Sequence, residues 1–248
     1  MFKVSIIMPS YNSANFIKKA VDSVLNQSYS EWELIIVDDC STDDSVTIIE
    51  EYSEIDSRII LIKKNVNSGV ADTRNLAIKS ASGFYLAFLD SDDIWDSEKL
   101  KSQVDFMRKN NASISFTQYF RIDSNDTLIK EIQNIPEAVT YKDLLKGNSI
   151  AMSTSMIEYK KIDGVFFEKI GHEDYYFWLK ILKLGFVAHG LKETLVFYRV
   201  HQSSLSSNKF KAIKYTWFIY RNMLKLNILE TVYYFFIHEF RAVIKRII

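Results

Sequence analysis

The sequence predicts an α/β fold with a mostly parallel sheet, flanking helices and a helical extension at the C-terminal end. Three observations lead to this prediction. Strand-like and helix-like segments alternate with short connections over residues 1–89. The strand-like segments are continuous apolar runs, as expected for strands that are buried on both faces. Three of the runs end directly in polar or acidic residues, and in open α/β sheets ligands bind beyond the carboxyl ends of the strands.

The first half of the chain shows this alternation most clearly. Val4–Met8 is an apolar, β-branched run that ends at Pro9, and Trp32–Val37 runs into Asp38-Asp39. Phe84–Leu89 follows Gly83 and runs into Asp90. The other segments expected here are a helix carrying Phe16–Leu25, a helix from a capping-box-like Ser41–Asp44 to Tyr52, a strand over Arg58–Ile62, and a helix over Ala71–Ser80.

The second half is less regular. Helices are expected over Ser97–Lys109, Thr140–Lys146 and Glu173–Leu184, and strands over Ser113–Ile122, near Met152–Ile157 and over Thr194–Val200. From about Lys209 the chain has the pattern of two helices that are separated near Asn227.

Composition places the chain among ordinary globular proteins. It has 248 residues, 48% apolar and 25% charged, with a formal net charge of zero, so no nucleic-acid partner is expected. The single Cys40 excludes an internal disulfide and fits a reducing, cytoplasmic compartment. The N-terminal residues lack the pattern of a signal peptide, and no uncharged stretch reaches the roughly 20 residues that a membrane span needs.

The polar clusters at the strand ends have a chemistry in common. Asp90, Asp92 and Asp93 crowd together after an apolar strand, and a divalent cation would relieve their repulsion. Such a cation, Mn²⁺ or Mg²⁺, would neutralise a diphosphate leaving group. Tyr11 can flank a base, and Asp39 can accept a hydrogen bond from the imino N–H of uracil. The guanidinium of Arg74 or Arg199 could bind the diphosphate, because its forked N–H donors match the geometry of phosphate oxygens.

These motifs, taken in order, resemble family 2 glycosyltransferases, which have the Rossmann-like GT-A fold. The resemblance rests on residues 4–12, 33–39, 67–75, 89–93, 171–178 and 198–201, and it covers about Val4–Ser204. Within residues 67–75, Ala71 and Arg74 are separated by two residues, whereas the family usually has them adjacent. The resemblance implies a catalytic domain over 1–207, with a nucleotide-binding part (1–95) and an acceptor-binding part (96–207), followed by a basic aromatic tail (208–248).

The resemblance also implies a reaction and a set of site residues. It implies an inverting hexosyltransferase-type enzyme that moves a sugar from a UDP-sugar to a growing surface glycan, such as a capsule, lipooligosaccharide or O-antigen chain. Asp174, within the Glu173-Asp174 pair, matches the catalytic base. The nucleotide-binding candidates are Pro9, Tyr11, Asp39, Arg74, Asp90 and Ser91. The metal candidates are Asp92, Asp90 and His201, and Arg199, Trp95 and His172 are assigned to the diphosphate or the acceptor.

Two alternative functions stay open at this point. A nucleotidyltransferase also uses a parallel sheet and metal-binding carboxylates, although it would normally have a glycine-rich loop where Pro9–Asn12 stands. A catalytically inactive scaffold that binds nucleotide-sugars is the second alternative. Acidic residues that merely cap helices are the structural explanation for Asp38-Asp39 and for Glu173-Asp174.

The tail has an uneven charge. Residues 208–248 contain eight basic and two acidic side chains, interleaved with aromatic residues such as Trp217, Tyr233 and Phe236. Such a segment is expected either to lie on the inner face of the cytoplasmic membrane, where a lipid-linked acceptor would be found, or to pack on its own domain or on a second subunit. A homo-oligomer is therefore left open.

Overall fold

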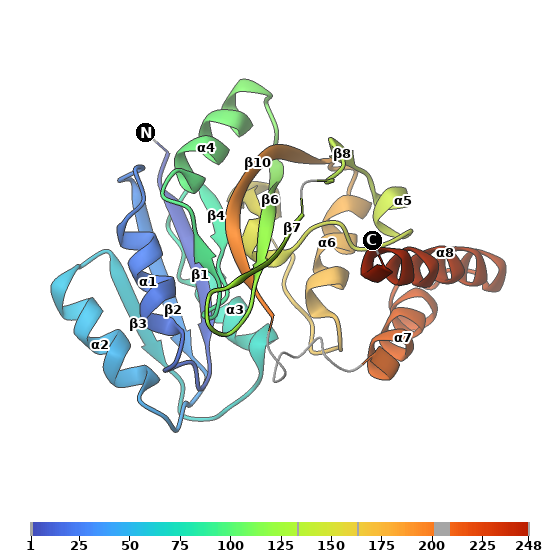
Figure 1. The fold of residues 1–248 in the computed structure, drawn as a ribbon. Helices are drawn as coiled ribbons and strands as arrows, with labels where there is room; N and C mark the ends of the chain where they lie inside the picture. Colours follow the sequence, from blue (N-terminus) through green and yellow to red (C-terminus); the bar gives the residue numbers. More distant parts are fainter. Residues whose placement is uncertain (1, 133, 163, 201–208, 248) are drawn as a thin grey trace.

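The computed structural model describes residues 2–132, 134–162, 164–200 and 209–247, and Figure 1 shows a sheet between two layers of helices. The strands are β1 (Val4–Ser10), β2 (Trp32–Asp38), β3 (Ile59–Lys63), β4 (Tyr85–Phe88), β5 (Ile94–Trp95), β6 (Ile114–Ile122), β7 (Leu128–Ile132), β8 (Ala138–Val139), β9 (Met156–Glu158) and β10 (Ala188–Arg199). The α-helices are α1 (Ile17–Leu25), α2 (Ser45–Ile55), α3 (Val70–Lys79), α4 (Lys99–Lys109), α5 (Tyr141–Leu144), α6 (Glu173–Lys183), α7 (Lys209–Phe218) and α8 (Ile228–Ile247). Shorter helical turns are η1 (Met152–Thr154), η2 (Tyr159–Ile162) and the π-helical η4 (Ile219–Met223).

The strands form one sheet in the order β3-β2-β1-β4-β9-β6-β10-β5, with β7 on β6 and β8 on β10. The three longest pairings, β6–β10, β1–β2 and β2–β3, are parallel. The antiparallel pairings are shorter, and among them β9 is inserted between β4 and β6. The predicted α/β fold with a mostly parallel sheet, flanking helices and a C-terminal helical extension is confirmed.

Successive side chains of a strand point to opposite faces of the sheet, so the apolar side chains are divided between two cores. Val4, Ile6 and Met8 of β1 pack with α1, α2 and α4 on one side, whereas Ile7 packs with α3, α5 and α6 on the other. All four side chains are fully buried. The sheet therefore needs apolar residues at every position of its central strands, which is why these strands appear in the sequence as unbroken apolar runs.

The structure corrects several local predictions. Ser41–Asp44 does not form a capping box, because the Ser41 hydroxyl donates to Asp38 and the Asp44 side chain makes no capping bond to α2. The strand expected near Met152–Ile157 is split into η1 and β9. The late strand begins at Ala188 instead of Thr194, and β5, β7 and β8 were not predicted.

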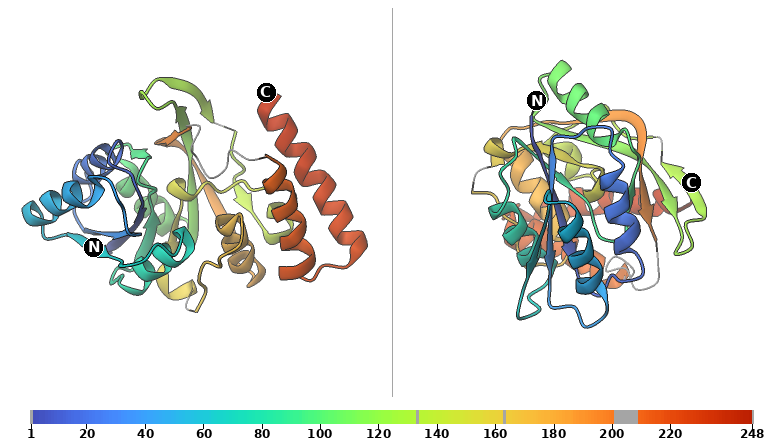
Figure 2. Two further views of the ribbon diagram at one scale, coloured as in Figure 1. Left: turned by 90° about the horizontal axis from the view of Figure 1, so that it is seen from below. Right: turned by 90° about the vertical axis from the view of Figure 1, so that its left-hand side faces the viewer.

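The tail packs on the side of the sheet that α3, α5 and α6 cover. In Figure 2 (left) α7 and α8 lie side by side at the edge of the molecule. Tyr220 of η4 is fully buried; its hydroxyl lies 2.7 Å from that of Tyr175 in α6 and donates to the carbonyl of Leu145 at 2.6 Å. Within the described ranges, no helix combines the length and apolar character needed to cross a bilayer.

Candidate active site

The sheet brings three of the predicted clusters to one edge. β2, β1 and β4 are adjacent and parallel, so their carboxyl ends, at Asp38, Ser10 and Phe88, face the same way. The polar residues that follow these strands therefore line one rim of the sheet, as a nucleotide site requires.

Asp39 lies just beyond β2 in a pocket of hydrogen-bond donors. Its carboxylate accepts hydrogen bonds from Lys64 Nζ at 2.5 Å, from the Ser68 amide at 2.9 Å and from the Gly69 amide at 2.8 Å. Burial would raise the pKa of Asp39, but these donors outweigh burial and hold its pKa below the ordinary value. Asp39 is therefore a fixed, ionised acceptor.

Backbone conformations support this pocket. Gly69 has φ +90°, a value that favours glycine, and it turns its amide toward Asp39 at the start of α3. Cys40, next to Asp39, also has a positive φ of 65°. A non-glycine residue in this region stores strain that the surrounding contacts must offset, and such residues concentrate at functional sites.

The acidic loop after β4 is held from inside the protein. Asp93 is 1% exposed; its carboxylate accepts a hydrogen bond from the Ser153 hydroxyl and another, at 2.7 Å, from the Arg199 amide. The same Ser153 hydroxyl accepts the Asp90 amide at 3.1 Å. Burial first, and then the charges of Asp92 and Asp90, raise the pKa of Asp93 well above its ordinary value. Asp93 and Ser153 thus anchor the loop, which leaves the half-buried Asp90 and Asp92 at its surface.

Arg74 connects this loop to α6. Its guanidinium is buried, with Nη2 at 2.5 Å from Asp90 Oδ1 and Nη1 at 4.0 Å from Glu173 Oε1. Burial would lower the pKa of Arg74, yet the charges of Asp90, Glu173 and Asp174 raise it. The strand-end carboxylate and the Glu173-Asp174 pair, distant in sequence, therefore share one cation.

The start of α6 presents the second group of acidic side chains. His172 precedes the helix with a left-handed backbone (φ 62°), and Glu173 and Asp174 occupy the first turn, where a helix favours negative charge. Burial raises the pKa of Glu173, an effect that Arg74 opposes and that Asp174 and Asp90 reinforce. Burial lowers the pKa of His172, whereas the charge of Asp174 acts the other way.

The donor set fits a divalent cation of the kind that completes its coordination shell with substrate. Over the described ranges, no group of three or more histidine, cysteine or acidic side chains is arranged to hold an ion. Asp90 and Asp92 nevertheless offer two carboxylates, and Mg²⁺ or Mn²⁺ typically takes one or two carboxylates with waters and phosphate oxygens. Of the predicted metal ligands, His201 lies outside the described residues.

Two predicted site residues have other roles. Arg199 has a side chain only 1% exposed; it donates to the carbonyls of Asp92 and Asp123, each at 2.7 Å, and pairs with Asp126 at 2.6 Å. It therefore positions loops and has no edge for a diphosphate or an acceptor. Trp95 is 3% exposed, donates to the Ser153 carbonyl at 2.8 Å and lies under Lys99, so it packs in the core instead of stacking on a sugar.

The remaining nucleotide candidates stay predictions. Pro9 is buried in β1 opposite Val37, whereas Tyr11 is 51% exposed just beyond that strand and is available to a base. Ser91 is half-buried between Asp90 and Asp92.

Sequence reasoning missed two residues that organise the site. Lys64 directly follows β3, and a basic residue at a strand end beside two acidic strand ends could have drawn attention to it. Ser153 gives no such signal, because it is one serine among many and lies far along the chain from Asp90.

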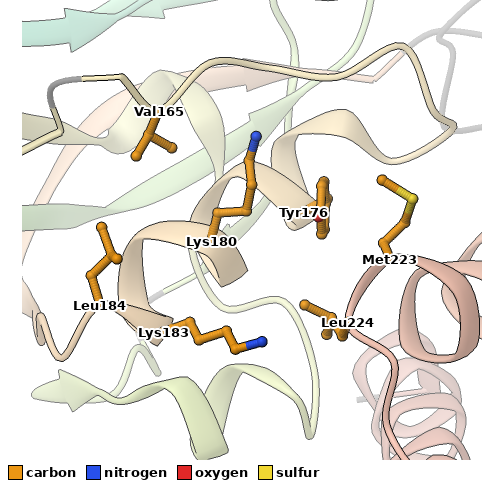
Figure 3. Close-up of a pocket in the computed structure, with 7 residues that line it drawn as sticks. All are labelled: Val165, Tyr176, Lys180, Lys183, Leu184, Met223 and Leu224. Carbon is orange, nitrogen blue, oxygen red and sulfur yellow. The ribbon is translucent and has the colours of Figure 1, made fainter.

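Two cavities lie near α6. One, of about 230 Å³, is lined by residues 68–71, by Lys169 and Ile170, and by Glu173, so it adjoins both the Asp39 pocket and the acidic start of α6. The other, of about 450 Å³, lies between α6 and η4 (Figure 3), lined by Val165, Tyr176, Lys180, Lys183, Leu184, Met223 and Leu224. The larger cavity contains none of the carboxylates, so the smaller one is the better candidate for the reacting groups.

Comparison with known proteins identifies relatives over the whole chain. The profile described as "Glycosyl transferase family 2" matches residues 5–181. A putative teichuronic acid biosynthesis glycosyltransferase, TuaG, of Bacillus subtilis is 42% identical over 98% of this chain and 97% of its own length. WfgD of Escherichia coli, described as a UDP-Glc:alpha-D-GlcNAc-diphosphoundecaprenol beta-1,3-glucosyltransferase, is 40% identical over 94% of this chain and 90% of its own.

Solved structures share the fold at low identity. S. aureus TarS 1-349 in complex with UDP-GlcNAc has a TM-score of 0.72 and 22% identity, and the match covers 89% of this chain and 67% of that one. The mannosyltransferase PcManGT of Pyrobaculum calidifontis, in complex with GDP-Man and Mn²⁺, has a TM-score of 0.70 and 16% identity over 91% of this chain and 65% of that one.

The Lys64–Asp39 pair predicts a pH-dependent effect on stability. Replacing Lys64 by Met should lower the free energy of unfolding at neutral pH by about 1–3 kcal/mol, because a buried carboxylate loses a charged donor. The depressed pKa of Asp39 adds stability above the ordinary aspartate pKa of about 4, and this stability is lost as pH falls through the folded-state pKa. Wild type and variant should therefore converge in acid.

Urea titrations at a series of pH values from neutral to acidic measure the difference in the free energy of unfolding. The matched control is Lys63→Met, which removes an exposed pair with Glu50 and should change stability by well under about 1 kcal/mol. A gap between Lys64→Met and wild type that is independent of pH would contradict the role assigned to Asp39.

Proposed function

Because this chain belongs to glycosyl transferase family 2, we propose that it is an inverting transferase that moves a sugar from a UDP-sugar to a hydroxyl of a growing surface glycan. The observation that carries the proposal is the shared Arg74. It brings the Asp90 carboxylate and the start of α6 into one site beside the Asp39 pocket. A donor site and a base must be adjacent for direct transfer.

The donor is assigned to the rim of the sheet. Asp39, fixed and ionised, accepts the imino N–H of uracil, and Tyr11 flanks the base from its exposed position. Asp90 and Ser91 are assigned to the ribose and the diphosphate. The solved complexes with UDP and UDP-GlcNAc are of a protein with the same fold, which supports a uridine donor as the first to test.

The chemistry needs one proton acceptor and a stabilised leaving group. Asp174 removes the proton of the acceptor hydroxyl while that oxygen attacks the anomeric carbon from the side opposite the diphosphate. The new C–O bond forms as the bond to the diphosphate breaks, so UDP leaves and the anomeric configuration inverts. Arg74 keeps Glu173 and Asp90 in place during this step. A divalent cation bound by Asp90 and Asp92 would offset the charge of the departing diphosphate.

The printed descriptions of two relatives support a choice of acceptor. TuaG is described in teichuronic acid biosynthesis, and the printed name of WfgD specifies a diphosphoundecaprenol-linked sugar. We therefore assign a lipid-linked glycan as the acceptor and the cytoplasmic face of the membrane as the place of work. A basic tail would suit that location.

A panel of UDP-sugars tests the proposal directly. Purified protein with Mn²⁺ or Mg²⁺ should release UDP slowly from one donor, and EDTA should abolish the release. UDP binding without turnover, with acceptor supplied, would instead favour the nucleotide-sugar-binding scaffold. Calorimetry that detects no UDP binding in the presence or absence of Mn²⁺ would overturn the assignment of the donor.

Asp174→Asn separates binding from transfer. The variant should bind UDP within about twofold of wild type but lose roughly 10²–10⁴-fold in transfer rate, because it lacks the base. Glu168→Gln removes a carboxylate close in sequence that pairs with Lys180 instead, and it should retain activity. If Asp174→Asn is active while Glu173→Gln is not, the base is Glu173.

Asp92→Asn tests the cation site. In wild type, Mn²⁺ should strengthen UDP binding about tenfold or more, and in the variant this gain should fall to about twofold or less. Asp105→Asn, an exposed change on α4, serves as the control. An undiminished gain in Asp92→Asn would exclude Asp92 as a ligand.

Ser153→Ala tests a positioning residue. The variant removes one hydrogen bond from the Asp90 amide and one from the Asp93 carboxylate, so kcat should fall about 10- to 100-fold and the Mn²⁺ concentration for half-maximal rate should rise. Ser155→Ala is the matched control, since this equally buried hydroxyl donates only to the Met152 backbone and sulfur. Equal losses in both variants would indicate a packing effect alone.

A further inference from the structure

The outer face of α8 is apolar. Leu229, Tyr233, Phe236 and Phe240 recur at spacings of three and four, so they form one stripe along the helix. Their exposed fractions are 80%, 56%, 68% and 66%. A helix at the edge of a globular domain normally has polar residues on this side.

The inner face of the same helix is already occupied. Thr231 is buried, and the His238 ring lies 5.2 Å from the Tyr175 ring of α6 and 6.4 Å from the Tyr220 ring of η4. α8 thus packs on the domain through one side and leaves the apolar stripe exposed on the opposite side. Contiguous apolar surface of this kind marks an interaction site.

The charge of the tail as a whole indicates what covers the stripe. The described part of the tail exposes the basic residues Lys211, Lys214, Arg221, Lys225 and Arg241. Its two acidic residues are engaged locally, because Glu230 accepts the Asn227 amide at the start of α8 and Glu239 lies 3.3 Å from His238. Trp217 and Phe218 of α7 add aromatic surface, at 37% and 41% exposure.

We propose that the outer face of α8, formed by Leu229, Tyr233, Phe236 and Phe240, docks on the surface of an anionic lipid bilayer. Exposed aromatic and aliphatic side chains enter the headgroup region, and the exposed lysine and arginine side chains of the tail add long-range attraction to anionic lipid. A second copy of the chain fits less well. The positions beside the stripe, Glu230, Val232, Ile237 and Glu239, supply no opposite charges for a paired helix.

Docking through α8 would set the orientation of the proposed active site, a consequence that rests on the proposed function. α7 adjoins the start of α6, since the Tyr215 ring lies 5.9 Å from the His172 ring and a side chain at Gly171 would collide with Tyr215. A lipid-linked acceptor would therefore approach Glu173 and Asp174 from the side of the molecule that α7 and α8 form (Figure 2).

Vesicle sedimentation of the full chain tests the surface. Wild type should bind vesicles of equal parts phosphatidylglycerol and phosphatidylcholine, and bind pure phosphatidylcholine more weakly. Phe236→Ser/Phe240→Ser should lower the partition coefficient roughly tenfold or more, because two large apolar groups no longer enter the lipid. Leu229→Ser/Tyr233→Ser should act in the same direction.

The control is Ile55→Ser/Ile129→Ser, which removes comparably exposed aliphatic groups elsewhere, at 83% and 57% exposure, and should leave binding unchanged. UDP release in solution should be equal in all variants, so failure of docking and failure of the proposed transfer are distinguishable. Equal vesicle binding by wild type and both stripe variants would overturn the proposal. A wild-type dimer in light scattering that both stripe variants convert to monomer, without vesicle binding, would assign the stripe to a second copy.

Discussion

The site depends on one buried cation. Arg74 lies between Asp90, at the end of a central strand, and Glu173, at the start of a helix whose sequence is nearly a hundred residues away. A buried guanidinium must be paired and hydrogen-bonded, and removing one partner of a buried ion pair typically costs about 3–5 kcal/mol. The two halves of the site are therefore held together by electrostatics that neither half could satisfy alone. The buried Asp93 and Ser153 fix the loop that carries Asp90 and Asp92.

Local pattern and strand order account for what the sequence could predict. Buried parallel strands appear as apolar runs, and their carboxyl ends lie at one edge by topology, so Asp39, Asp90 and their neighbours could be grouped without coordinates. The grouping of Glu173 and Asp174 with these residues required the family's motif order, because nothing in the local sequence connects α6 to β4. The contacts of Arg74 with Asp90 and Glu173 depend on the tertiary structure and could not be predicted from local sequence. They are consistent with the predicted grouping, yet the roles of the individual residues remain proposals.

The errors have a physical origin as well. Arg199 and Trp95 have chemistry that suits phosphate and sugar, but residue type does not reveal burial. The Arg199 guanidinium donates hydrogen bonds to two carbonyls and pairs with Asp126. The Trp95 indole donates to the Ser153 carbonyl and lies under the Lys99 ammonium. Ser41 was assigned to a helix cap, whereas Asp38 outcompetes the helix for its hydroxyl. For Arg199 and Trp95 the deciding partners include residues far away along the chain, and for Ser41 the deciding partner is the strand-end carboxylate of Asp38.

The position of β9 has a consequence for biogenesis. This short strand separates β4 from β6, so the backbone groups on one edge of Tyr85–Phe88 find their partners only when Met156–Glu158 arrives. On a translating ribosome that delay lasts several seconds, and during this time an apolar strand has an open edge. The N-terminal half of the nascent chain can thus fold early, whereas the open edge of β4 is covered only when β9 has been made. A holding chaperone could bind this edge in the meantime.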